Sequence, residues 1–72
     1  MADLQEKLQV LLDYWIEHNG EHEQEFRDWA DKVGSLSANV TRQLQAAATL
    51  MVAVSGELMK AKQALSKSKK RH

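Results

Sequence analysis

The chain lacks two residue types altogether and is poor in a third. Its 72 residues include no cysteine, no proline and only three glycines. Without cysteine the chain forms no disulfide bonds and no thiolate metal sites. The shortage of helix breakers, together with abundant leucine, alanine, glutamate, glutamine and lysine, predicts an all-α chain. A chain this short buries a modest core and often needs a metal ion or a partner subunit for stability.

Long apolar runs and catalytic signatures are also missing. No segment approaches the roughly 20 apolar residues that span a membrane. Residues 1–4 lack the positive charge and the apolar core that begin a signal peptide. No glycine-rich phosphate loop and no Ser/His/Asp grouping is present. We therefore expect a soluble cytoplasmic protein that has no membrane span and is not an enzyme.

Each half of the chain is poor in charge of one sign, although the net charge is zero. Residues 1–33 carry nine acidic and three basic side chains, whereas residues 34–72 carry one acidic and seven basic side chains. This split predicts that the two halves attract each other, within one chain or between copies. The basic run at 67–72 is short and contains no aromatic residue, so we expect a disordered tail without nucleic-acid binding.

Apolar residues recur at helical spacing through the first half of the chain. The main stripe has four-three spacing and consists of Leu4, Leu8, Leu11, Trp15, His18, His22, Glu25 and Trp29. Six further residues widen it, namely Leu12, Ile16, Asn19, Phe26, Ala30 and Val33. The stripe keeps its phase across Gly20, and an interior glycine costs only about 1 kcal/mol relative to alanine. We therefore predict one helix over about 3–33.

A short break separates this helix from a second one. Gly34 fits the position after a helix, and Ser35 or Ser37 fits the N-cap of the next helix. A second four-three stripe follows, formed by Val40, Leu44, Ala47, Met51, Val54, Leu58, Ala61 and Leu65. It predicts a helix over about 37–66. Two long helices joined by a short turn form an antiparallel hairpin, so residues 1–66 are expected to make one domain.

The middle of the second helix is too apolar for a single neighbour. Between residues 44 and 54 only Gln45 and Thr49 interrupt the apolar surface. We therefore expect a homodimer that forms a four-helix bundle, with the two turns at opposite ends. The predicted interface consists of Leu44, Ala47, Leu50, Met51, Val54 and Leu58.

Two histidines on the first helix are candidate metal ligands. His18 and His22 are four residues apart, so both imidazoles can point to one side of a helix and bind Zn²⁺, Ni²⁺ or Co²⁺. Glu25 is a candidate third ligand, and Glu21 a candidate outer or bridging carboxylate. The alternative is that His22 and Asn19 form a hydrogen-bonded polar layer that fixes helix register in a metal-free interaction module. That module would dock a protein partner through its second helix.

The first helix also contains a motif that resembles a known group of sequences. It lies within residues 11–30 and reads Trp15-Ile16-Glu17-His18-Asn19-Gly20-Glu21-His22, followed by Trp29-Ala30. This segment resembles a group of small, uncharacterised bacterial and archaeal helical proteins. The resemblance implies that Trp15, Glu17, His18, Asn19, Glu21, His22 and Trp29 belong together. It favours a metal-handling role, and the prediction is a small non-enzymatic protein that holds a transition metal ion.

Overall fold

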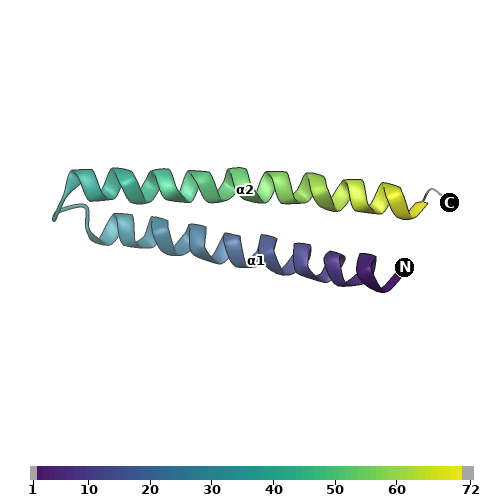
Figure 1. The fold of residues 1–72 in the computed structure, drawn as a ribbon. Helices are drawn as coiled ribbons and strands as arrows, with labels where there is room; N and C mark the ends of the chain where they lie inside the picture. The colour runs from purple at the N-terminus through teal and green to yellow at the C-terminus, as the bar shows by residue number, and fades with distance from the viewer. Residues whose placement is uncertain (1, 71–72) are drawn as a thin grey trace.

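The chain folds into two long antiparallel helices. The computed structural model describes residues 2–70, and both helices are continuous: α1 spans Ala2–Lys32 and α2 spans Ala38–Lys70. They lie side by side over their whole length, so the molecule is a rod of 56 × 15 × 11 Å (Figure 1). The prediction of an all-α helical hairpin is confirmed.

The helix bounds agree with the prediction except at the end of α2. The helix α1 continues through Gly20 without a break, as expected from the unbroken stripe. In contrast, α2 reaches Lys70, four residues beyond the predicted end near 66. Lysine is a good helix former, and positive charge complements the partial negative charge of a helix C-terminus. The disorder predicted for 67–72 stays a prediction, and its residues 71 and 72 lie outside the described part.

The turn is held by a helix cap and by one bond between the helices. Ser37 is the N-cap of α2, because its Oγ accepts a hydrogen bond of 3.2 Å from the Val40 amide. The hydroxyl of Thr41 donates to the carbonyl oxygen of Ala30 at 3.2 Å, which satisfies an acceptor in the last turn of α1. Within the described chain no glycine has a positive φ, so Gly34 does not form a left-handed cap.

Small residues set the distance between the helices. Three apolar residues are buried in the described part of the chain: Leu12, Ala30 and Ala48. The half-buried residues that extend this seam are Ile16, Phe26, Val33, Leu44, Met51, Leu58 and Leu65. Two of the buried residues are alanines, whose small side chains leave room for the helices to approach closely on the turn side of the hairpin. The core is therefore thin, and it leaves many large side chains uncovered.

The seam of α1 differs from the main stripe seen in the sequence. The residues that only widened the stripe, such as Leu12, Phe26 and Ala30, face α2 and are buried or half-buried. Leu4, Leu8, Leu11, Trp15 and Trp29 of the main stripe are exposed. The stripe of α1 therefore covers two surfaces, one against α2 and one on the flank of the hairpin. In the part of the chain that the structure describes, neither helix has a stretch apolar enough to cross a membrane.

Candidate metal centre

His18 and His22 lie one turn apart on α1, and their rings converge. The two Nε2 atoms are 3.0 Å apart, so one nitrogen donates a hydrogen bond to the other. The side chains are 45 % and 40 % exposed, so both rings are open to solvent. No group of three histidine, aspartate or glutamate side chains within the described residues is placed to hold a metal ion. One chain thus brings two ring nitrogens together.

Each histidine has a carboxylate three residues further along the helix. Nδ1 of His22 donates to Oε1 of Glu25 at 2.9 Å. Nδ1 of His18 is 3.7 Å from Oε1 of Glu21, beyond hydrogen-bonding distance. Both carboxylates therefore lie on the Nδ1 side of their ring, away from the point where the Nε2 atoms converge. The arrangement places Glu25 behind His22, and not beside its Nε2 as a third ligand would be.

Two further rings bracket the histidines. Tyr14 stacks on His18 with ring centroids 5.3 Å apart and planes 13° apart. Phe26 stacks on His22 with centroids 6.0 Å apart and planes 19° apart. The two imidazoles meet edge to face, with centroids 4.4 Å apart. Four rings at successive four-residue intervals thus restrict the rotation of both histidines.

This ring ladder was missed at the level of sequence, although its signal was present. Tyr14, His18, His22 and Phe26 follow one another at intervals of four residues, a spacing that brings side chains into contact on a helix. The sequence pattern placed Phe26 among the residues that widen the apolar stripe and gave Tyr14 no role. The structure shows that each stacks on one of the two imidazoles.

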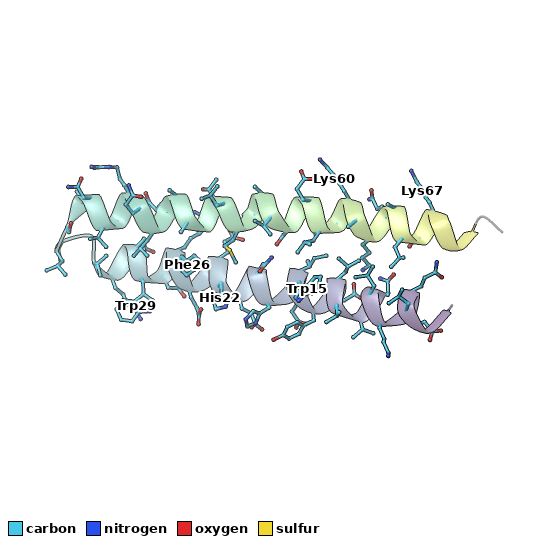
Figure 2. All side chains as sticks on the ribbon, viewed as in Figure 1. Trp15, His22, Phe26, Trp29, Lys60 and Lys67 are labelled. Atoms are coloured by element: carbon cyan, nitrogen blue, oxygen red, sulfur yellow. The ribbon has the colours of Figure 1, made fainter. Side chains whose placement is uncertain are left out.

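The surroundings of His18 are open. A shallow hollow of about 230 Å³ is lined by Tyr14, Glu17, His18 and Glu21. On the same side of α1, Trp15 and Trp29 are exposed, and the ammonium group of Lys32 lies 4.5 Å from the ring centroid of Trp29. In Figure 2, Trp29 projects away from α2, whereas Phe26 lies between the helices. The histidines thus belong to an outward surface of the hairpin.

Asn19 does not join His22 in a buried layer. Asn19 shares the heptad phase of Leu12 and Phe26 and is half-buried toward α2, whereas His22 lies on the flank. No polar side chain is fully buried among the described residues. A single hairpin therefore contains no polar core layer, and such a layer stays a prediction for an assembly.

A groove marks the opposite flank of the hairpin. It has a volume of about 380 Å³, and we call it the glycine groove; it is lined by Ile16, Gly20, Glu23, Val52, Ser55, Gly56 and Met59. His22 and Val54 are two residues from Gly20 and Gly56, hence about 200° around their helices. Both therefore lie on the other flank, the histidine face, which we define as Leu11, Trp15, His18, His22, Trp29, Ala47, Leu50 and Val54.

The six residues predicted for a dimer interface fall into two groups. Leu44, Met51 and Leu58 are half-buried along the seam between α1 and α2. Ala47 is half-buried on the histidine face, whereas Leu50 and Val54 are exposed there, Leu50 to 65 %. The first group is used within one chain, so the second group is what a partner would meet.

Charged contacts between the helices are few in the described residues. Lys62 of α2 forms an ion pair with Asp13 of α1. The hydrogen bond from Lys62 lowers the pKa of the Asp13 carboxyl below its usual value of 3.8. The other ion pairs that involve lysine or arginine are local, with Arg27 bonded to Glu23 at 3.0 Å and Lys60 to Glu57 at 3.2 Å. Electrostatics thus joins the helices near their open end.

Comparison with known proteins finds a family without an assigned role. A family model described as a domain of unknown function (DUF8180) matches residues 8–65. An uncharacterised protein from the archaeon Archaeoglobus fulgidus is 40 % identical over 43 residues, which cover 60 % of this chain and 69 % of the relative. No solved structure matches the sequence. The matched family segment contains the histidine pair and nearly all of the hairpin.

Proposed function

This chain belongs to the DUF8180 family, and we propose that it is a small non-enzymatic protein that binds a divalent transition metal ion through His18 and His22. The observation that carries the proposal is the convergence of the two Nε2 atoms at 3.0 Å, with both Nδ1 atoms turned toward carboxylates. The proposal keeps the cytoplasmic location expected from the sequence.

The nitrogen separation fits a shared ion. Zinc–nitrogen bonds of about 2.0–2.1 Å place two ligands of a tetrahedral ion about 3.3 Å apart, and two adjacent ligands of a square-planar ion about 2.9 Å apart. The observed 3.0 Å lies between these values. To admit the ion, both rings must turn so that their Nε2 lone pairs point at it rather than along the line between the two nitrogens. Zn²⁺, Ni²⁺ and Co²⁺ all accept imidazole ligands, and they remain the candidates.

The hydrogen-bond pattern indicates which ring nitrogen of each histidine carries the proton, and therefore which proton must move when a metal ion binds. A neutral imidazole has one N–H group and one lone pair. Because His22 donates from Nδ1 to Glu25, its Nε2 accepts the hydrogen bond from Nε2–H of His18. A bound metal ion would take both Nε2 lone pairs after the His18 proton had moved to Nδ1. That proton would then face Glu21, whose Oε1 is 3.7 Å away.

In this proposal Glu25 and Glu21 support the ligands. A metal-bound histidine commonly donates its second N–H to a carboxylate, which fixes the ring and raises its basicity. Glu25 already accepts such a bond from His22. Glu21 needs to move closer to His18 to do the same. We therefore assign both glutamates to the outer shell, with Tyr14 and Phe26 holding the ring planes.

Catalysis is not part of the proposal. General acid–base catalysis depends on carboxylates whose pKa is tuned by burial or by close charges. Glu17 and Glu21 at the histidine site are exposed, and the hollow beside them is shallow and open. Water reaches every group that a substrate would meet, so the arrangement suits ion binding better than chemistry on a substrate.

A metal-free interaction module remains the second candidate. The observation in its favour is the exposed apolar surface of α2, where Leu50 and Val54 stand without cover in the single chain. In that role the histidines contribute shape and polarity, and a protein partner covers α2. The two candidates differ in whether the imidazoles bind metal in solution.

Calorimetric titration with Zn²⁺ tests the proposal. All proteins carry His72→Gln, so that His18 and His22 are the remaining imidazoles. We expect a dissociation constant below about 10 μM for this background, and a loss of about 100-fold or more for His18→Gln or His22→Gln. Circular dichroism checks that the variants keep their helices. Affinity weaker than about 100 μM, or affinity unchanged by the histidine variants, would contradict the proposal and leave the interaction module.

A further inference from the structure

The two-nitrogen site of one chain leaves a metal ion incompletely coordinated. Zn²⁺ in proteins usually has four ligands, and His18 and His22 supply two. The part of the chain that the structure describes offers no set of three suitable side chains. The carboxylates of Glu21 and Glu25 lie behind the rings, on the Nδ1 side. The missing ligands must therefore come from water or from another molecule.

The hairpin also exposes more surface than a compact protein of its mass. A folded monomer of this size exposes about 4,500 Å², whereas this chain of 8.2 kDa exposes 5580 Å². The surplus is close to the roughly 800 Å² that each partner buries in an interface of standard size. Part of that surplus is apolar and lies on the histidine face, at Leu11, Trp15, Trp29, Leu50 and Val54.

The position of the histidines along α1 suits a two-fold axis. Residue 17 is the midpoint of α1, and the pair at 18 and 22 lies close to it. An axis perpendicular to the rod at the level of residue 20 places α1 antiparallel to α1 of a second copy. The two histidine pairs then meet at the axis. In the same register, Leu11 of one copy faces Trp29 of the other, so apolar residues cover each other on both sides of the ion.

The other helix offers a matching contact at the same level. Thr41 bonds to Ala30 near the turn, and Lys62 pairs with Asp13 near the open end. Between these two contacts, residue 20 of α1 lies opposite about residue 53 of α2. Leu50 and Val54 flank that level on the histidine face. The two-fold axis that joins the histidine pairs therefore also brings α2 of one copy onto α2 of the other through aliphatic side chains.

Charge favours the same orientation. The exposed acids Glu25, Asp28 and Asp31 lie near the turn, while Lys60 and Lys67 lie toward the open end. A dimer with its turns at opposite ends brings the basic end of one copy to the acidic end of the other. Exposed pairs of this kind add little energy each, but they disfavour the reverse orientation.

From these observations, we propose that a second copy of this chain completes the site: one metal ion is bound by His18 and His22 of both copies, in a two-fold dimer whose turns lie at opposite ends. The inference rests on the proposed function, because it assigns the remaining ligands of the same ion. The four Nε2 atoms form the tetrahedral set that Zn²⁺ takes in closed protein sites. The contact is isologous, so each copy contributes the same two ligands.

Stoichiometry and mass test the sharing directly. Zn²⁺ is titrated into the full chain carrying His72→Gln, and the molar mass is followed by light scattering. We expect one ion per two chains, and a dimer dissociation constant at least about 10-fold lower with Zn²⁺ than with a chelator. One ion per chain, in a monomer or in a dimer, would overturn the sharing but leave the proposed function intact. If no Zn²⁺ binds, both fail together.

Matched charge variants locate the interface. Val54 and Val52 lie on the same helix and are 47 % and 49 % exposed, but Val52 lines the glycine groove on the opposite flank. We expect Val54→Glu to weaken the Zn²⁺ dimer by about 100-fold or more, because it buries an unpaired charge. Val52→Glu should leave the dimer unchanged. Helix content by circular dichroism distinguishes lost association from lost folding, and the opposite ranking of the two variants would overturn the proposed interface.

Distance measurements between copies test the orientation. The chain has no cysteine, so Ser35→Cys in the exposed turn gives a single labelling position. With the turns at opposite ends, two spin labels should be about 45 Å apart, from 1.5 Å of rise per residue on each side of residue 20. Turns at the same end would place them within about 20 Å, since packed helices lie 8–10 Å apart. The shorter distance would overturn the arrangement.

Discussion

The two flanks of the hairpin differ sharply at the same level along the rod. The histidine face carries His18 and His22, whose rings are stacked or hydrogen-bonded to neighbours one turn away. Across the molecule, the glycine groove contains Gly20 and Gly56, and a Cβ added at either position would meet nothing within 4 Å. On one flank the imidazole rings contact their neighbours, whereas the other flank carries an unfilled groove.

This difference shows that side-chain contacts order one flank of the hairpin and not the other. Glycine inside a helix costs about 1 kcal/mol relative to alanine, and nothing in the described chain fills the space beside Gly20 or Gly56. On the histidine face, in contrast, each imidazole lies between two neighbouring rings. The two imidazoles are therefore held in place by local contacts, whereas the groove has no comparable arrangement. Three predictions test this contrast, and a fourth tests the ion pair between the helices.

The largest effect is expected from metal on thermal stability. A ligand at 100 times its dissociation constant stabilises the folded state by about 2.7 kcal/mol, which corresponds to about 10–20 °C in a domain of this size. Thermal melts followed by circular dichroism should show this rise with Zn²⁺ in the wild type and not in His18→Gln/His22→Gln. Equal gains in both proteins would mean that the ion acts elsewhere.

The second effect concerns the carboxylates behind the histidines. Glu25→Gln should weaken Zn²⁺ binding about 10- to 100-fold, the range found when outer-shell partners are removed. Glu21→Gln should have a smaller effect, because its carboxylate is 3.7 Å from His18 rather than within bonding distance. Glu23→Gln is the matched control, since Glu23 pairs with Arg27 and lines the glycine groove. Calorimetry ranks the three, and a loss with Glu23→Gln as large as with Glu25→Gln would contradict the assigned roles.

The third prediction concerns substitutions that add a methyl group in the glycine groove. Gly20→Ala and Gly56→Ala should each stabilise the chain by about 1 kcal/mol, because the new methyl group improves helix propensity and meets no neighbour. Urea unfolding measures the change. Metal affinity should not respond, since both positions lie away from the imidazoles. Destabilisation would indicate that something occupies the groove in solution, and would shift the partner surface to that flank.

The smallest effect is a pH dependence at the open end. Lys62 lowers the pKa of Asp13, so the ionised pair stabilises the fold above the usual carboxyl pKa of 3.8 and ceases to do so as pH falls through the lowered value. The difference in stability between the wild type and Asp13→Asn should be constant above about pH 5 and shrink toward pH 3. Urea midpoints across this range provide the measurement. A difference that grows in acid would contradict the ion pair.

The sequence was sufficient to predict the helices but not which side of α1 meets α2. Two overlapping stripes covered α1, and hydrophobicity alone did not separate the one used within the chain. The structure separates them through Ala30 and Ala48, whose small side chains allow the helices to approach closely. Close approach depends on residues from both helices together, so a pattern along one helix does not reveal it.

The candidate site was only partly predictable, because sequence spacing places side chains on one side of a helix but does not orient their rings. A spacing of four residues is enough to place His18 and His22 on one side of a helix. Spacing does not tell which ring nitrogen points toward the neighbour, because that depends on two side-chain torsions and on the rings above and below. Glu25 was therefore assigned as a ligand from its spacing, whereas its carboxylate lies at Nδ1 of His22.

The exposure of both tryptophans on the histidine face has an optical consequence. Trp15 and Trp29 are each seven residues from His22, about 10 Å along the helix in either direction. Indole emission shifts to shorter wavelength when water is removed from the ring, and paramagnetic Cu²⁺ or Ni²⁺ quenches it at such distances. The natural chain therefore carries its own fluorophores beside the proposed ion, and unlabelled protein reports association and metal occupancy as two separate signals.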